Sequence, residues 1–201
     1  MEALTKKELL RLLKVTRARS ERDWLMILVG FWHGLRASEI CAGWRVRYVK
    51  KGKEKQKERY LHPGLRACDV RDGHLTVARA KNSLKTVQAL VEHPNALLSE
   101  RKALTEFARR ALYSQMPLFP MRRQHFWRLV KRYAKLAGIP EHKAHPHVLK
   151  HTIAMQMIDK AGIQKTRQRL GHKSIASTGV YLEETDANVD AVIVKAVRLG
   201  R

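Results

Sequence analysis

The segment from Trp24 to His33 constrains the fold of this chain more than any other stretch. It reads WLMILVGFWH, and it is apolar on nearly every side of the helix that its composition predicts. A helix that is apolar all round must be buried, so other segments have to pack against several of its faces. The apolar run is also about half as long as the roughly 20 residues that a membrane span requires. We therefore expect the central helix of a packed core.

The segments around this helix predict a mainly α-helical domain with a small antiparallel β-sheet, an α+β fold. Thr5 can cap a leucine-rich helix, and CDVRDGHLTVARA alternates around an Asp-Gly turn before KNSLKTVQALV resumes an extended pattern. Further helices are predicted over 99–113, with Ser99 as the cap, and over 122–136, with Leu136 on the apolar face. The sequence has no obvious linker, so we expect a single domain over 1–201.

The charge of the chain points to a polyanionic partner. Forty-one Lys and Arg residues face 18 Asp and Glu residues, a formal net charge of +23. Nucleic acid is the first candidate, because each phosphate neutralised releases condensed counterions. An anionic membrane is the second, but no lipidation motif or basic anchor helix stands out. The densest basic run, 45–59, holds eight basic residues against two acidic ones. It is interpreted as a solvated loop, which is compatible with phosphate contacts.

The stretch from His147 to Tyr181 carries most of the chemistry-bearing residues. His145, His147 and His151 invite a metal-site interpretation, but Val148 stands where a zinc protease has glutamate, and no further ligand is clearly placed. The sequence also lacks a glycine-rich phosphate loop, so neither a metal nor a nucleotide cofactor is expected.

Phosphoryl transfer at a DNA phosphodiester explains these residue types better. That reaction needs a nucleophilic hydroxyl, cations or donors for the charge on phosphorus, and a proton for the leaving oxygen. Tyr181 supplies the hydroxyl, and a tyrosyl phosphodiester conserves the energy of the broken bond. Candidate donors lie in three separate segments: Arg36, His147, Lys150 and His172. A lysine of the second turn, Lys81 or Lys85, could protonate the leaving group, although either could equally be a solvated turn residue.

At these residues the sequence resembles a known family. HGLRASEI, HPHVLKHT and LGHKSIASTGVY resemble the three hallmark segments of the tyrosine recombinase (phage integrase) family. The resemblance covers about residues 5 to 185, and it is closest to the small fimbrial phase-variation recombinases. It implies a site-specific recombinase that cleaves and rejoins DNA through a 3′-phosphotyrosyl intermediate, for integration, excision or inversion, as mobile elements require.

The resemblance also implies a role for each residue. The implied catalytic residues are Arg36, Lys81 (with Lys85 as the alternative), His147, Lys150, His172 and the nucleophile Tyr181, supported by Glu39 and His151. The implied DNA-binding residues are Lys50, Lys51, Lys53, Lys85, Arg122, Arg123, Gln124 and Lys173. RRQHF resembles the start of the family's groove-inserting helix, and no metal or other cofactor is implied.

Three features depart from the family pattern. Lys150 stands where arginine is usual, which keeps the charge but loses the bidentate fork that grips two phosphate oxygens. Residues 45–65 form an insertion between the first arginine's helix and the hairpin. We expect no separate N-terminal core-binding domain of the usual kind, so an accessory DNA-binding protein could complete the clamp on DNA. A C-terminal tail is expected over 184–201, and it could dock on a neighbouring copy or on its own domain.

The expected partners are double-stranded DNA at paired sites and three further copies of the chain in a synaptic homotetramer, with a monomer or weak oligomer when free. No membrane partner is expected, and the implied location is the cytoplasm, in association with the nucleoid of a prokaryote or with phage DNA. Three alternatives stay open: a non-catalytic DNA-binding regulator, a type IB topoisomerase that relaxes supercoils, and a basic RNA-binding or structural protein.

Overall fold

The computed structural model describes residues 2–51, 54–80, 83–174 and 176–179. From the N-terminus its elements are α1 (Lys6–Arg17), α2 (Glu21–Trp32), α3 (Ala37–Ile40), β1 (Gly43–Lys51), β2 (Glu54–His62), η1 (Ala67–Asp69), β3 (Val70–Arg71), β4 (His74–Val77), β5 (Thr86–Ala89), α4 (Arg101–Arg109), α5 (Arg123–Leu136), η2 (Glu141–Lys143), α6 (His147–Leu170) and α7 (Ala176–Gly179). The fold is mainly helical with small antiparallel sheets, which confirms the predicted α+β class, although the strands form two sheets rather than one.

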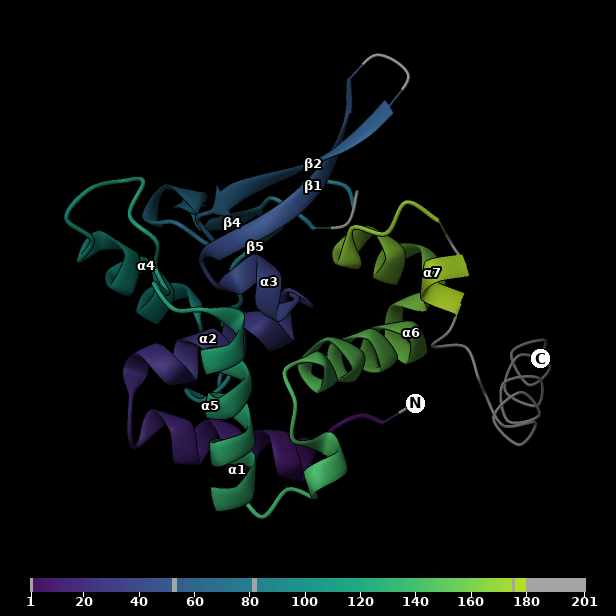
Figure 1. The fold of residues 1–201 in the computed structure, drawn as a ribbon. Helices are drawn as coiled ribbons and strands as arrows, with labels where there is room; N and C mark the ends of the chain where they lie inside the picture. The colour runs from purple at the N-terminus through teal and green to yellow at the C-terminus, as the bar shows by residue number, and fades with distance from the viewer. Residues whose placement is uncertain (1, 52–53, 81–82, 175, 180–201) are drawn as a thin grey trace.

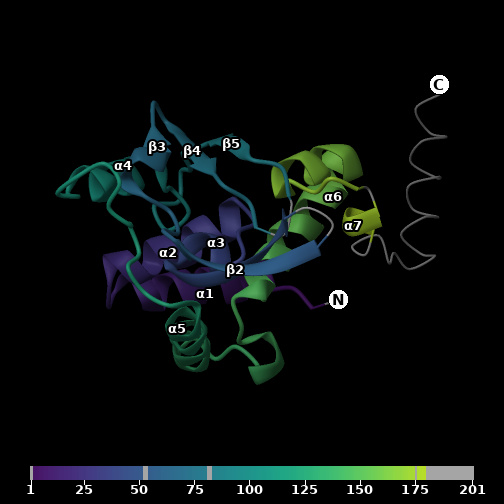
Figure 2. The ribbon, with the colours of Figure 1, turned by 45° about the horizontal axis from the view of Figure 1, so that its top comes forward.

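The predicted central helix is α2, and it is buried from Asp23 to Phe31. The side chains from Trp24 to Val29 are at most 2% exposed, and Phe31 is 1% exposed. Helices α1 and α6 pack against it, while the sheet lies on one side of α2 and α3 and helices α1 and α5 lie on the other (Figures 1 and 2). The N-cap of the helix is Ser20, whose hydroxyl accepts a hydrogen bond from the amide of Asp23.

Two other predictions about local structure are confirmed near the N-terminus and in the sheet. Thr5 forms a capping box with Glu8 at the start of α1. The strands β3, β4 and β5 form one antiparallel sheet in that order. Asp72 and Gly73 join β3 to β4 with φ of 51° and 71°, the left-handed conformations of a tight hairpin turn.

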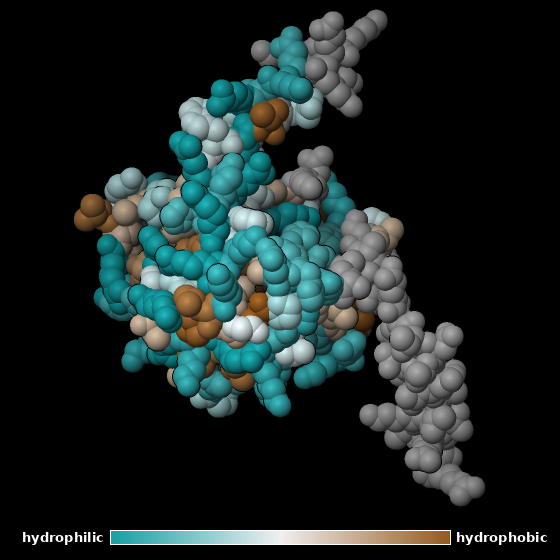
Figure 3. All heavy atoms as spheres, turned by 60° about the horizontal axis from the view of Figure 1, so that its bottom comes forward, coloured by the Kyte–Doolittle hydropathy of each residue, from teal (hydrophilic) through white to brown (hydrophobic). Residues whose placement is uncertain are grey.

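The basic run at 45–59 is not the solvated loop that its charge predicts. Strands β1 and β2 pair residue for residue, from Gly43 opposite His62 to Lys51 opposite Glu54. The resulting hairpin protrudes from the rest of the molecule (Figures 1 and 3). Trp44, Val46 and Tyr48 alternate with other residues along β1, and these residue types favour strands. The charge of the run hides this period of two.

The helices that follow the sheet differ from prediction at their ends. Helix α4 begins at Arg101 and ends at Arg109, and Ser99 does not cap it, because the Ser99 hydroxyl accepts instead from the amide of His93. Helix α5 begins at Arg123, and Leu136 on its last turn is 50% exposed rather than buried.

Helix α6 is long, and a break divides it. Gly162 has φ of 77° and ψ of 170°, so the run from His147 to Leu170 consists of two helical pieces joined at a kink. The first piece carries Lys150, and the second ends close to His172. No helix among the described residues has both the length and the apolarity that crossing a membrane requires.

Candidate active site

The turn between α2 and α3 places Arg36 beside the end of α6. Gly34 has φ of 56°, and a Cβ at this position would collide with the Leu170 side chain. Only glycine fits both the left-handed conformation and this close approach. Arg36 then stands at the N-cap of α3, where its amide and its Nη1 donate hydrogen bonds of 2.8 Å and 2.9 Å to the Glu39 carboxylate.

Arg79 holds this turn from the opposite side, and the sequence interpretation missed it. Its side chain is fully buried, and it donates to the carbonyls of His33 (2.9 Å), Gly34 (3.2 Å) and Arg169 (2.8 Å). It also lies 3.4 Å from the Glu39 carboxylate. One guanidinium therefore joins the end of α2, the start of α3 and the end of α6. The signal was present: Arg79 follows the buried Leu75 and Val77 at a spacing of two, which is an inward position.

Glu39 is an ionised carboxylate at the centre of this network. Burial alone would raise its pKa, but the charge of Arg79 and the amides of Arg36 and Ala80 lower that pKa below its ordinary value. The side chain is 1% exposed, and its oxygens accept from both Arg36 and the Ala80 amide, the latter at 2.9 Å. This satisfies the carboxylate, so its role is to orient Arg36.

Lys150 is the least satisfied charged group near the turn. Its side chain is 1% exposed, and Nζ has no hydrogen-bond partner among the residues that the structure describes. Burial, and next the charge of Arg36, lower its pKa from 10.5 to about 7, while Glu39 opposes that shift. A buried ammonium without a partner is costly, and an anion at Nζ would remove much of that cost.

His172 follows the end of α6 and lies in the field of Lys150 and Arg36. Gly171 turns the chain with φ of 68°, and a Cβ there would lie 2.8 Å from the Leu84 carbonyl. His172 is 7% exposed, and its Nδ1 lies 3.0 Å from the Thr178 hydroxyl of α7. Burial, then Lys150 and Arg36, lower its pKa to about 4, so the ring is neutral near pH 7. When the Thr178 hydroxyl donates to Nδ1, Nε2 carries the proton and can donate it.

His147 and His151 lie together on the first turns of α6. Their ring centroids are 4.6 Å apart, with an angle of 86° between the planes. Burial, and next the charge of His147, lower the pKa of His151 to about 4. No group of three or more metal-binding side chains lies close enough to hold an ion among the described residues.

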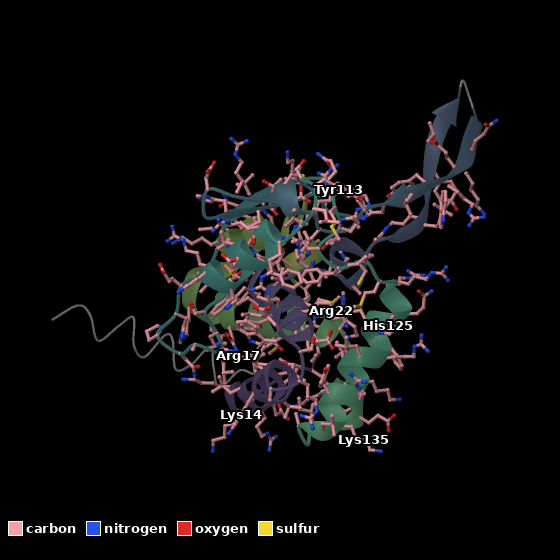
Figure 4. All side chains as sticks on the ribbon, turned by 90° about the vertical axis from the view of Figure 1, so that its left-hand side faces the viewer. Lys14, Arg17, Arg22, Tyr113, His125 and Lys135 are labelled. Carbon is pink, nitrogen blue, oxygen red and sulfur yellow. The ribbon has the colours of Figure 1, made fainter. Side chains whose placement is uncertain are left out.

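The start of α5 lies on the same side of the molecule as the hairpin (Figure 4, where His125 marks this end of α5). Arg123 and Gln124 line a cavity of about 540 Å³ together with Trp127 and His147. The exposed Arg122 precedes them as the N-cap of α5. The structure thus brings the predicted DNA-binding residues of α5 beside the predicted catalytic histidine.

Several predicted site residues are not part of this assembly as described. Lys53, Lys81 and Tyr181 lie outside the described residues, as does the tail at 184–201. Lys50 and Lys51 belong to β1, but their side chains also lie outside the description. Lys85, directly before β5, and Lys173, directly after His172, are exposed.

A second buried hydrogen-bond network, which the sequence interpretation also missed, holds the end of α2 in place. His33 lies 2.8 Å from the Gln88 amide oxygen through Nδ1 and 2.9 Å from the Glu100 carboxylate through Nε2. Arg169 donates to the Trp32 carbonyl beside it. The end of α2 is thereby fixed to β5, to the start of α4 and to the end of α6.

Comparison with known proteins finds similarity to one sequence family and to several tyrosine recombinases. The sequence model of the phage integrase family matches residues 64–188. Tyrosine recombinase XerD of Xanthomonas campestris pv. campestris is 36% identical over 112 residues, which are 52% of this chain and 33% of that protein. Tyrosine recombinase XerA of Thermococcus kodakarensis is 29% identical over 194 residues, 92% of this chain and 58% of that protein.

Two solved structures share the fold. A crystal structure of XerA recombinase matches 98% of this chain and 63% of its own with a TM-score of 0.68 and 20% identity. A lambda integrase tetramer bound to a Holliday junction matches 86% of this chain and 47% of its own with a TM-score of 0.61 and 18% identity. The chain spans from about a third to less than two thirds of the length of these relatives.

Proposed function

Since the chain belongs to the phage integrase family of tyrosine recombinases, we propose that it cleaves and rejoins DNA strands at specific sites through a covalent tyrosyl intermediate. The observation that carries this proposal is the buried Lys150 ammonium, which has no partner among the described residues and lies beside Arg36 and His172. Three groups that can hold a phosphate are thus gathered from α3, α6 and the turn after α6.

The charge balance of this cluster favours an anionic ligand. Glu39 is already paired with Arg36 and Arg79, so it does not neutralise Lys150 as well. A phosphodiester at Nζ would supply the missing negative charge and would return the pKa of Lys150 toward its ordinary range. Because Glu39 and Arg79 hold Arg36 and its turn in place before DNA binds, this donor needs little rearrangement when charge develops on phosphorus.

The proposed reaction is a transesterification at that phosphate. The Tyr181 oxygen attacks phosphorus, the P–O5′ bond breaks, and the strand is left with a 3′-phosphotyrosyl bond and a 5′-hydroxyl. Arg36, Lys150 and His172 stabilise the pentacoordinate phosphorus, and a hairpin lysine, Lys81 or Lys85, protonates the leaving oxygen. A 5′-hydroxyl of the partner strand then attacks and releases the tyrosine, so the reaction needs no external energy source.

His147, on the cavity that also contains Arg123 and Gln124, is proposed to contact the same phosphate. Thr178 supports the proposed position of the nucleophile, because it contacts His172 and precedes Tyr181 by three residues in the sequence. His151 is proposed to support His147 from the next turn of α6.

The remaining proposals concern partners and organisation. Paired double-stranded sites and a synaptic homotetramer are proposed by analogy with the lambda integrase tetramer on a Holliday junction. Four further proposals come from the sequence alone. They are a single catalytic domain over 1–201, an accessory DNA-binding protein that completes the clamp, a nucleoid location in the cytoplasm, and a special likeness to the fimbrial phase-variation recombinases.

Covalent capture tests the proposed chemistry on a pool of DNA sequences rather than on one chosen target. The native protein is incubated with a nicked duplex library of randomised core sequence, in which cleavage releases a short fragment and traps the adduct. A denaturing gel should show a protein–DNA band that Tyr181→Phe abolishes. Failure of the native protein to form the band, or an undiminished band with the variant, would sink the recombinase proposal. If the protein relaxes a supercoiled plasmid that carries a captured sequence, without exchanging paired sites, the result would instead identify a topoisomerase.

A further inference from the structure

The hairpin formed by β1 and β2 has one face that nothing in the described structure covers. Strand pairing places Trp44 opposite Leu61, Val46 opposite Arg59 and Tyr48 opposite Lys57 on that face. The four apolar side chains among these residues are 54% to 65% exposed. A row of exposed apolar side chains on a protruding element marks an interaction surface.

Cations are interleaved with these aromatic rings. The Arg59 guanidinium lies 5.6 Å from the centroid of the Trp44 ring, and the Lys57 ammonium lies 6.0 Å from that of Tyr48. Such pairs hold a positive charge and an aromatic surface side by side. A ligand suited to this face therefore offers negative charges next to flat or apolar groups.

The opposite face and the base attach the hairpin to the proposed active site. Arg45 on the opposite face donates to the Cys41 carbonyl at 3.0 Å. After β2, Gly64 has φ of 69°, and a Cβ there would lie 2.5 Å from the Ile40 carbonyl, which also accepts from the Leu65 amide at 3.1 Å. The chain that leaves the hairpin is thus fixed to α3, whose other end carries Arg36.

A continuous line of residues joins the exposed face to the cavity beside His147. Trp44 and Arg59 line a hollow of about 280 Å³ together with Arg122, Arg123 and Gln124 at the start of α5. Arg123 and Gln124 also line the cavity that contains His147. A polyanion bound at the phosphate site can therefore extend over α5 and onto the hairpin without crossing an acidic surface on this line.

We propose that the hairpin is an arm that binds the DNA duplex on one side of the cleavage point. The inference rests on the proposed function, because it requires duplex DNA at the active site. Lys57 and Arg59 contact phosphates, while Trp44, Val46 and Tyr48 pack against sugars and base edges in a groove, which a two-stranded ribbon can enter. With a formal charge of +23, a second copy of this chain is a poor occupant for the same basic face.

The length of the hairpin sets the size of the proposed contact. Each strand has nine residues, which span about 30 Å at roughly 3.3 Å per residue. That length corresponds to about nine base pairs at a rise of roughly 3.4 Å. The arm should therefore reach as much as one helical turn of duplex beyond the α5 contacts.

Two pairs of substitutions separate the two parts of the proposed contact. Affinity for a random-sequence duplex of about 40 base pairs is measured by fluorescence anisotropy over a range of salt concentrations. Lys57→Gln with Arg59→Gln should lower the slope of log affinity against log salt by about 1.8, because each lost phosphate contact removes about 0.9. Trp44→Ala with Tyr48→Ala should weaken binding by about tenfold, as truncated aromatic contacts to nucleic acid do, and leave the slope unchanged.

Matched controls use exposed residues of the same type elsewhere. Arg71→Gln, at an 85% exposed side chain, controls for the lost charge, and Tyr113→Ala, at 61% exposure, controls for the lost ring. Both should bind like the native protein. A duplex of about 12 base pairs is too short to reach the arm. On this duplex the hairpin variants should lose at least about fivefold less affinity than on the duplex of about 40 base pairs.

Three results would overturn the arm. The first is that both pairs of variants keep the native affinity for DNA and the native salt slope. The second is that the variants lose equal affinity on the long and the short duplex. The third is a change in self-association without DNA, measured by sedimentation, that accounts for the lost affinity. The last result would assign the face to a protein partner. Covalent capture by the native protein separates this failure from failure of the recombinase proposal, because capture does not depend on how the hairpin variants bind.

Discussion

Replacing Lys150 by methionine should make the protein more stable and, at the same time, inactive. Lys150 is 1% exposed, and its pKa falls from 10.5 to about 7 because burial penalises the charged form. Methionine is similar in length and carries no charge that would need to be desolvated. The buried Lys150 ammonium therefore lowers the stability of the free protein, and a bound anion would offset that loss.

The size and sign of the effect follow from linkage. Between pH 7 and pH 10.5 the unfolded chain keeps the Lys150 proton and the folded chain releases it, so the native protein gains stability as pH rises through that window. At about 1.4 kcal/mol per pH unit, the penalty is on the order of 4 kcal/mol at pH 7 and about 1 kcal/mol at pH 9.5. Lys150→Met removes this penalty. The gain in the free energy of unfolding of the variant over the native protein should therefore shrink as pH rises from 7 to 9.5.

Urea unfolding at the two pH values measures this advantage. Lys150→Met should raise the free energy of unfolding by several kcal/mol at pH 7 and by clearly less at pH 9.5. Because the variant lacks one phosphate donor, covalent capture should fall by about 100-fold to 1000-fold, as the loss of one transition-state donor does. A variant that is less stable than the native protein, or a stability gain that does not change with pH, would refute the inference that the buried Lys150 ammonium is a net cost to the folded protein.

Three further predictions concern the framework of the site. Arg79→Met should lower the free energy of unfolding by about 3–5 kcal/mol, because the buried Glu39 loses one of the two arginines paired with it and three buried carbonyls lose the donor that Arg79 gives them; the exposed control Arg71→Met should change it by less than about 0.5 kcal/mol in the same urea titration. Gly34→Ala should lower the thermal midpoint and reduce capture, since a left-handed alanine costs about 1–2 kcal/mol even before its contact with the end of α6, and a native midpoint would contradict this. DNA binding by the native protein should weaken as pH rises through 7, where free Lys150 loses its proton; Lys150→Arg should remove this dependence, and identical pH profiles would count against it.

The sequence predicts elements whose signal is local and periodic. The all-round apolar pattern of α2, the Thr5 cap and the Asp72–Gly73 turn each depend on a few neighbouring residues, and each is found as predicted. The approach of Arg36 to Lys150 could also be anticipated, but only through the family resemblance, because more than a hundred residues separate them in the sequence.

What the sequence does not predict depends on competition between signals or on distant contacts. The charge of residues 45–59 outweighed the alternation that forms β1 and β2. The predicted Ser99 cap of α4 is wrong, because the Ser99 hydroxyl accepts a hydrogen bond from the His93 amide instead. Arg79 acts through carbonyls of α2 and α6, and no local pattern reports those partners. That Lys150 has no hydrogen-bond partner among the described residues likewise depends on how distant segments pack.

Peptide mapping of the covalent adduct tests the central claim most directly. After nuclease and trypsin digestion, mass spectrometry should find nucleotides attached through a 3′-phosphate to the peptide 174–195, whose only tyrosine is Tyr181. Fragmentation should place the added mass on Tyr181, and the released strand should carry a free 5′-hydroxyl. Attachment at another residue, or through a 5′-phosphate, would contradict the proposed mechanism.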